Sequence, residues 1–277
     1  MIATEITSQA GEIIEIDGLR TYSIKTGTGP AIVLIHGGAP GACARVNWGP
    51  AIDPLAAAGF TVYAYDQPGY GQSDNPADFS MEYRFRHAKA YIESLGLDRY
   101  IVMGNSQGSY IAARIALEDP RVQKLVLVAS GTLAPKGSAA ADAQSREHAE
   151  RLRAYVPSLE NSRSLTSQTL VNPERVTEEL VRLRYEMSTG KNREAEELRR
   201  GTPAPPPITD ELKNLNVPVL LLWGAQDSGA ALERSLLLLQ SIPGAELHIF
   251  DRCGHWVQWD QADRFNTIVR DFLTADR

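Results

Sequence analysis

The chain has 277 residues, 43% hydrophobic and 22% charged, which suits one large domain, or one domain with an inserted smaller one. A net charge of -6 leaves no basic excess to neutralise phosphates, which argues against a nucleic-acid partner. Cys43 and Cys253 alone cannot build a disulfide framework, and no run approaches the ~18 apolar residues of a membrane span. Because Met1–Gly11 also lacks a signal pattern, we expect a cytoplasmic protein.

Strand-like and helical runs alternate through the first half of the chain. An Asp17-Gly18 pair between two apolar runs predicts a hairpin at the start. Buried-strand runs then recur every ~20 to 40 residues with helical stretches between them, which is typical of βαβ units and a parallel sheet. The expected strands are Glu12–Asp17, Leu19–Thr26, Ala31–His36, Thr61–Tyr65, Tyr100–Met103 and Leu125–Val128, and the expected helices are Pro50–Ala58, Ser80–Leu95 and one that ends near Glu118.

The alternation stops at Leu133 and resumes after Asn216. The intervening segment is helical and charged and has no buried-strand run. The sequence therefore predicts an α/β fold with a mostly parallel central sheet flanked by helices, in which residues 1–132 and 217–277 form the core and residues 133–216 an inserted helical cap. The alternative is a helical subdomain with no role at a site. Expected cap helices are Ala139–Tyr155, Pro173–Met187 and Arg193–Arg200, with Ser162–Leu170 unassigned; the later elements are the strands Val217–Trp223 and Glu246–Phe250 and the helices Ala230–Gln240 and Asp263–Thr274.

A serine lies where an expected strand meets the next helix. The stretch Gly104-Asn-Ser-Gln-Gly108 follows the apolar run Tyr100–Met103 directly. Glycines two residues before and after Ser106 allow the chain to turn sharply and expose the hydroxyl at a helix N-terminus. This arrangement suits a nucleophile with an oxyanion-binding N–H beside it. A Gly/Ser loop that merely caps a helix is the alternative.

A serine nucleophile needs a histidine base. His255 follows the last expected strand in a glycine-containing loop, where a parallel sheet presents side chains to a shared crevice. We therefore predict His255 as the base. The other four histidines have different expected places, which are helix surfaces for His87 and His148, a strand interior for His248, and the end of a strand, where it orders the next loop, for His36.

The base in turn needs a carboxylate to orient it. Asp227 follows the penultimate expected strand directly. Asp66 is the main alternative, but its loop indicates a turn in which the carboxylate accepts backbone N–H bonds. Asp251 is a weaker alternative because it is too close in sequence to His255 to face it easily. The order Ser106, Asp227, His255 is the nucleophile–acid–histidine order expected when the serine turn lies mid-sheet.

A second oxyanion donor is expected from the loop His36-Gly-Gly-Ala-Pro-Gly41. Small residues let its backbone approach the serine closely. We predict that the Gly38 N–H joins the Gln107 N–H in an oxyanion hole. The loop could also be a glycine-rich packing turn, and the two roles are compatible.

Four stretches together match the pattern of one known family. They are His36-Gly-Gly-Ala-Pro-Gly-Ala42 with Asn47 downstream, Asp66-Gln-Pro-Gly-Tyr-Gly-Gln-Ser-Asp74, Gly104-Asn-Ser-Gln-Gly108 and Leu247-His-Ile-Phe-Asp-Arg-Cys-Gly-His-Trp-Val-Gln258. The chain resembles the α/β-hydrolase superfamily along nearly its whole length. Within it, the chain resembles the meta-cleavage product hydrolases, which cleave a C–C bond in ring-opened catechols. The Cys-Gly-His-Trp run is the most specific signal because it is unusual among general esterases.

The resemblance implies a substrate and residues that bind it. The substrate is a 2-hydroxy-6-oxo-dienoate with a variable C6 substituent, from ring fission of an aromatic compound, and its C5–C6 bond is hydrolysed. Arg184, on a cap helix, would anchor the dienoate carboxylate through its planar guanidinium. Asn47, Asn105 and Trp256 would line the dienoate end. The alternatives are a solvated helix arginine, backbone bonding for Asn105 and core packing for Trp256.

Three departures from the family pattern leave the natural substrate open. Gln107 stands where the family usually has Met or Leu, and Ser109 replaces a common glycine. The loop after Asp227 lacks a Val-Pro pair, and the cap matches only around Arg184. A carboxylesterase or lactonase with the same triad is therefore the alternative function, and a non-enzymatic binding module is a more distant one. No cofactor or metal is implied, and the resemblance suggests a homodimer or larger homo-oligomer.

Overall fold

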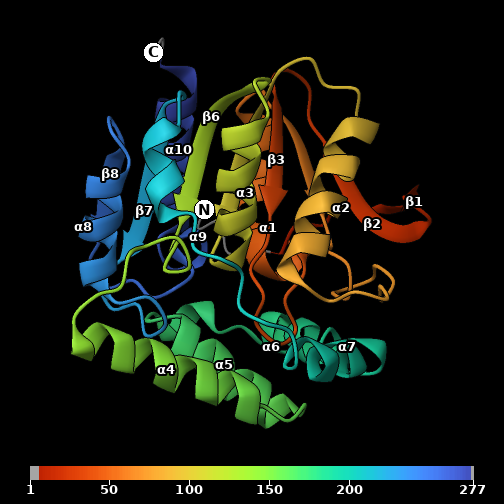
Figure 1. Ribbon diagram of the computed structural model, residues 1–277. Coiled ribbons are helices and arrows are strands. Elements are labelled where there is room, and N and C mark those ends of the chain that lie inside the picture. Colours follow the sequence, from red (N-terminus) through yellow and green to blue (C-terminus); the bar gives the residue numbers. More distant parts are fainter. Residues whose placement is uncertain (1–5, 276–277) are drawn as a thin grey trace.

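The computed structural model describes residues 6–275. The strands in this range form a single eight-stranded sheet (Figure 1). Its strand order is β1-β2-β4-β3-β5-β6-β7-β8. The strands from β3 to β8 pair in parallel, and β1 and β2 extend the β4 edge antiparallel. The mostly parallel sheet predicted from the sequence is therefore confirmed. The strands are β1 Glu12–Ile16, β2 Leu19–Thr26, β3 Ala31–Ile35, β4 Thr61–Tyr65, β5 Tyr100–Asn105, β6 Val122–Val128, β7 Val219–Gly224 and β8 Glu246–Phe250.

Most helices lie where the sequence places them, with four differences. The first helix begins at Ala44 rather than Pro50, because the Asp66 carboxylate accepts the Ala44 N–H and holds an earlier turn. The predicted helix Pro173–Met187 is two helices, because the Thr177 side chain caps the second. The unassigned cap stretch is α5, and the two short helices α9 and η2 were not predicted. The α-helices are α1 Ala44–Ala57, α2 Met81–Ser94, α3 Gln107–Glu118, α4 Ala139–Ala154, α5 Leu159–Thr169, α6 Glu178–Glu186, α7 Lys191–Arg199, α8 Leu232–Ser241, α9 Val257–Asp260 and α10 Ala262–Thr274; the 3-10 helices are η1 Pro173–Arg175 and η2 Thr209–Asn214.

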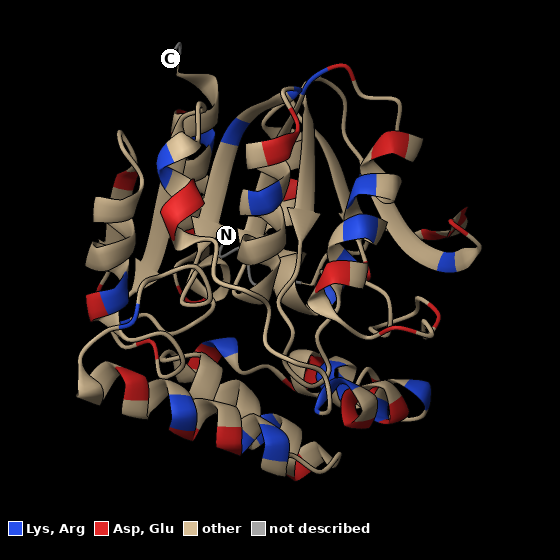
Figure 2. Cartoon of the chain, in the orientation of Figure 1, with Lys and Arg blue, Asp and Glu red and all other residues tan. Residues whose placement is uncertain are grey.

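Apolar layers cover both faces of the sheet because side chains alternate along each strand. Val33 and Ile35 of β3 pack with α2 and α3, which lie in front of the sheet in Figure 1, whereas Ile32 and Leu34 pack with α1 and α10 behind it. The central strands carry almost no charge (Figure 2). Burial on both faces explains why these strands are continuous apolar runs.

Helices α4 to α7 lie together across one end of the sheet. They are inserted between β6 and β7 and cover the carboxyl ends of the parallel strands (Figure 1). Their outer surface is rich in both acidic and basic residues (Figure 2). The helices therefore form a lid over the edge where parallel sheets present their functional groups.

Candidate active site

Ser106 lies at the tip of a tight turn between β5 and α3. Its backbone has φ 54° and ψ -120°, which few residues with a side chain adopt. A Cβ on Gly104 would collide with the Gly108 backbone, and one on Gly108 would collide with the Ile35 carbonyl. The two glycines therefore allow the strand, turn and helix to close around the serine, as the sequence predicts.

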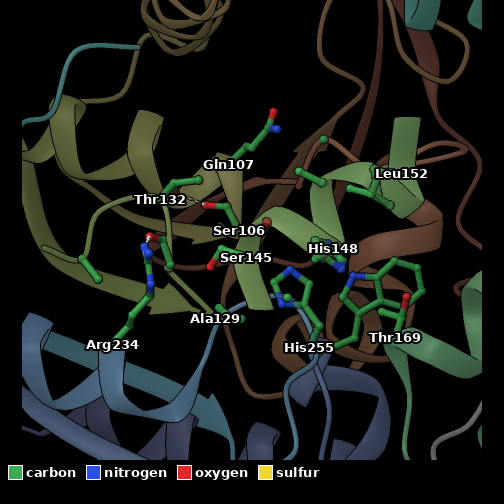
Figure 3. A pocket seen from close by; sticks show the side chains of 18 of the residues that line it. Ser106, Gln107, Ala129, Thr132, Ser145, His148, Leu152, Thr169, Arg234 and His255 are labelled. Carbon is green, nitrogen blue, oxygen red and sulfur yellow. Dashed lines mark hydrogen bonds between the residues drawn. The ribbon is translucent and has the colours of Figure 1, made fainter. Parts of the chain in front are cut away.

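Asp227 and His255 lie within hydrogen-bond distance although 28 residues separate them. His255 Nδ1 is 2.8 Å from Asp227 Oδ2, and the N–H groups of Gly229 and Ala230 donate to the other carboxylate oxygen. The carboxylate is thus fixed on both sides, so it can orient the imidazole. Ser106 and His255 line the same cavity (Figure 3).

The competing acids have other partners. Asp66 is buried and accepts the N–H groups of Ala44 and Gln72, as expected for a turn carboxylate. Exposed Asp251 accepts a hydrogen bond from the Gln226 side chain. Neither contacts His255, which leaves Asp227 as the carboxylate that faces it.

Of the other histidines, His87 and His148 are not on the helix surfaces predicted for them, whereas His36 has the position predicted for it. His36 is buried and joins two loops, because its Nε2 accepts the Gln67 N–H; this agrees with the ordering role predicted for it. His87 is not on a helix surface, since it is buried against the Thr21 hydroxyl. His148 is not on an outer surface either, since it lines the cavity with its ring 6.0 Å from that of His255. His248 lies half-buried on the edge strand β8.

The loop after β3 passes close to the serine. A Cβ on Gly37 would lie 3.2 Å from the Ser106 Cβ, so only a glycine backbone approaches this closely without displacement. Gly38 packs against the Gln107 side chain, whose Oε1 accepts a hydrogen bond of 3.1 Å from Arg84. Figure 3 shows the Gln107 side chain extending away from Ser106. Gln107 can therefore offer its backbone N–H beside the serine while its side chain bonds elsewhere.

A cavity of about 410 Å³ lies between the sheet and the lid. Core residues, including Gly38, Ser106 and His255, form one wall, and helix α4 forms another (Figure 3). The α4 residues that line it are Ser145, His148, Ala149 and Leu152. Sequence reasoning missed this wall, although the spacing of these residues places them on one helix face.

Arg184 lies in this cavity rather than on a solvated helix surface. It is 1% exposed, and its Nε donates to the Pro40 carbonyl. Its guanidinium lies 4.8 Å from the Trp256 ring centre and within 3.4 Å of the Thr166 and Thr169 hydroxyls. Burial lowers the pKa of Arg184 to about 10, so the group stays charged at neutral pH. No ion pair joins Arg184 to a carboxylate within residues 6–275.

Trp256 also lines the cavity, whereas the two asparagines lie behind its wall. Asn47 and Asn105 are both buried, and Asn47 donates to the Asn105 side chain at 2.9 Å. Asn105 donates to the Val128 carbonyl, so it braces β6 as well. The Asn47 Oδ1 has no hydrogen-bond partner in the part of the chain described. The structure thus brings the asparagines together but does not place them on the cavity surface.

Two broader features of residues 6–275 bear on the type of site. In that range, no three His, Cys, Asp or Glu side chains converge as metal ligands. Over the same range, no helix has the length and apolarity needed to cross a membrane.

The fold and the site define a hydrolase of the α/β type, and comparison with known proteins agrees. Residues 30–262 match the family model described as "alpha/beta hydrolase fold", and the chain belongs to that family.

The resemblance to meta-cleavage product hydrolases is also confirmed. A 2-hydroxy-6-oxononadienedioate/2-hydroxy-6-oxononatrienedioate hydrolase of Dechloromonas aromatica is 34% identical over 88% of this chain and 86% of its own length. The meta-cleavage product hydrolase CumD of Pseudomonas fluorescens IP01 superposes with a TM-score of 0.83 at 30% identity, covering 95% of this chain and 97% of its own. The 2-hydroxy-6-oxo-6-phenylhexa-2,4-dienoate hydrolase BphD of Rhodococcus sp. strain RHA1 superposes at 0.82 with 30% identity, over 96% and 100%.

Proposed function

We propose that this protein is a serine-dependent hydrolase that cleaves the C5–C6 bond of a 2-hydroxy-6-oxo-dienoate in aromatic compound degradation. The observation that carries the proposal is Arg184, a buried cation in the same cavity as Ser106 and His255. A buried guanidinium is costly unless an anion accompanies it, and a dienoate carboxylate supplies one. The names of the relatives agree with this substrate class and differ in the group on C6.

The chemistry is assigned to three residues. His255, oriented by Asp227, moves the proton that converts the enol of the substrate to its keto form, and then removes the Ser106 proton. Ser106 Oγ attacks the C6 carbonyl. The C5–C6 bond then breaks, and its electron pair moves through C4 and C3 onto the C2 carbonyl oxygen, which takes the proton from His255 to give the 2-hydroxydienoate. The C6 acyl group stays on Ser106. Water then releases the carboxylic acid and restores the serine.

The negative charge that develops on the C6 oxygen needs hydrogen-bond donors. We assign this role to the backbone N–H groups of Gly38 and Gln107, because both residues line the cavity beside Ser106. At the other end, Arg184 holds the C1 carboxylate with Trp256 beside it. Asn47 and Asn105 are assigned to the dienoate end by the resemblance alone, since both are buried and neither lines the cavity.

The lid is part of the proposal. A cap of residues 133–216 on a core of 1–132 and 217–277 would exclude water once the substrate binds. The predicted cytoplasmic location and the homodimer or larger homo-oligomer stay predictions. Size-exclusion chromatography with light scattering measures the assembly directly.

Replacing Arg184 tests the proposal. With Arg184→Ala we expect kcat/KM for dienoates to fall roughly 10- to 100-fold, since a charged hydrogen-bonded contact is lost. Hydrolysis of neutral p-nitrophenyl esters should hardly change. The loss of substrate colour measures dienoate cleavage. Arg182→Ala, on the exposed side of α6, is the matched control.

The opposite outcome identifies the alternative function. If wild type cleaves simple esters or lactones but bleaches no dienoate, the protein is an esterase or lactonase with the same triad. If a fluorophosphonate probe fails to label Ser106, neither hydrolase assignment holds.

A further inference from the structure

The side chain of Gln107 packs directly on Gly38, the residue that supplies the other oxyanion donor. A Cβ on Gly38 would collide with the Gln107 side-chain oxygen and would lie 3.0 Å from the Tyr70 hydroxyl. The Tyr70 hydroxyl also donates a hydrogen bond of 3.3 Å to the Gly38 carbonyl. The side chain of one oxyanion-hole residue therefore rests against the backbone of the other.

Arg84 of α2 holds this arrangement from behind. Its Nη2 donates to the Gln107 Oε1 at 3.1 Å, and its Nη1 lies 3.4 Å from the Tyr70 hydroxyl. Arg84 is 5% exposed, so its side chain is fixed by packing on all sides. Because the guanidinium is planar and carries several donors, one group contacts both side chains that pack on Gly38.

No carboxylate draws Arg84 away from these contacts. Among residues 6–275 no ion pair includes Arg84, and Glu196, which lines the same cavity, pairs with Arg199 at 2.9 Å and Arg200 at 3.8 Å. A buried guanidinium with neutral partners alone lowers the stability of the fold. A side chain that lowers stability is expected where it serves the site.

The two oxyanion donors lie beyond the part of the sheet that pairs their strands. β3 and β5 pair in parallel as far as Ile35 and Gly104. Gly38 and Gln107 each lie three residues beyond that pair. Both N–H groups have to point at one oxygen to stabilise the charge that develops on it. Past the last strand pair, side-chain contacts are what can fix their spacing.

We propose that the Gln107 side chain and Arg84 form a brace that sets the distance between the Gly38 and Gln107 N–H groups, so that Arg84 is a positioning residue of the oxyanion hole. The inference rests on the proposed function, which assigns the hole to these two N–H groups. Arg84 lines a cavity next to the catalytic one but not the catalytic cavity itself, so it acts through Gln107 and not on the substrate.

A double-mutant cycle of Arg84→Met and Gln107→Met tests the brace. In each single variant we expect kcat for p-nitrophenyl esters and for dienoates to fall roughly 10- to 100-fold with KM little changed, because the donors lose their alignment in the transition state. The double variant should lose no more than either single one, because two apolar side chains of similar length replace both partners.

Two further variants separate the brace from a general effect of charge or folding. Arg84→Lys keeps the charge and a donor, so it should recover part of the lost kcat. Arg86→Gln, on the exposed side of the same helix, is the matched control and should behave like wild type.

A boronic acid gives a readout that does not depend on turnover. Its boron bonds Ser106 Oγ while His255 takes the hydroxyl proton, and the tetrahedral adduct places an oxygen in the oxyanion hole. We expect the Kd of phenylboronic acid to rise in both single variants in step with the loss of kcat. A purely structural role for Arg84 would lower the free energy of unfolding and leave the Kd unchanged.

Each other outcome has a definite meaning. The brace is overturned if the losses of kcat add in the double variant, or if KM rises while kcat and the boronic acid Kd hold. If Arg84→Met does not fold, Gln107→Met and Arg84→Lys decide, and an unchanged kcat in Gln107→Met overturns the brace. If wild type bleaches no dienoate, the proposed C–C cleavage fails, whereas the ester and boronic acid measurements still decide for or against the brace.

Discussion

Ser106 carries backbone strain that its neighbours maintain. Its φ of 54° and ψ of -120° cost a residue with a Cβ roughly 1–3 kcal/mol. The turn is held on both sides, because the Ser106 N–H donates to the Val128 carbonyl and the Thr132 hydroxyl donates to the Ser106 carbonyl. The side chain that the chemistry needs is thus present at the expense of stability.

Replacing Ser106 should separate its two roles. Both Ser106→Ala and Ser106→Gly should lose hydrolysis. The free energy of unfolding should be about 1 kcal/mol higher for Ser106→Gly than for Ser106→Ala. The glycine relieves the backbone strain, and this gain exceeds the extra entropy of glycine in the unfolded chain. Urea denaturation measures the difference, with Ser106→Ala as the matched control. An alanine variant at least as stable as the glycine one would show that the turn is unstrained.

The short helix α9 ties the lid to the loop that carries His255. Asp260, its last residue, is 4% exposed and accepts the N–H of Gly254, just before His255, at 2.7 Å. The same carboxylate accepts the N–H groups of Val171 and Asn172, which follow the lid helix α5. One carboxylate therefore sets the position of the histidine loop against the lid.

Asp260→Asn should lower both the stability of the protein and its catalytic rate. An amide NH₂ would face N–H donors in place of one oxygen, so we expect the free energy of unfolding to fall by about 1–3 kcal/mol. We also expect kcat to fall, because the His255 loop loses a support. Denaturant unfolding and steady-state kinetics check the two effects. Asp263→Asn, exposed at the start of α10, should change neither, and an unchanged kcat in Asp260→Asn would limit Asp260 to stability.

Across the whole molecule, three histidines are held in their neutral form. Burial lowers the pKa of His36 to about 3, and that of His87 and His148 to about 4. In the unfolded chain each takes up a proton near pH 6.5. Between about pH 4 and 6.5 the unfolded state therefore binds more protons, so these residues make stability fall as pH falls. Asp66 has the opposite sign, since burial raises its pKa to about 6.

Acidification from pH 7 to 4.5 should therefore destabilise the protein, because three histidines outnumber one aspartate. The slope of unfolding free energy against pH should drop by about 1.4 kcal/mol per pH unit in His87→Gln, which removes one such proton. Urea unfolding at a series of pH values measures the slope. Half-exposed His248→Gln is the control, and an unchanged slope in His87→Gln would mean that His87 is protonated in the folded state as well.

The sequence by itself determined the sheet, most of its helices and the places of Ser106, Asp227 and His255. These follow from local patterns: apolar runs form buried strands, and loops at the ends of parallel strands converge on one edge. Their catalytic roles remain proposals, but the contact between Asp227 and His255 is in the structure.

Only the tertiary structure decided which other side chains reach the site. His148 faces the cavity because of how α4 packs over the sheet, although its sequence resembles that of an exposed charged helix. Arg84 meets Gln107, and Asp260 meets Asn172, across long separations in sequence. Such contacts depend on how separate elements pack, and no local pattern encodes that packing.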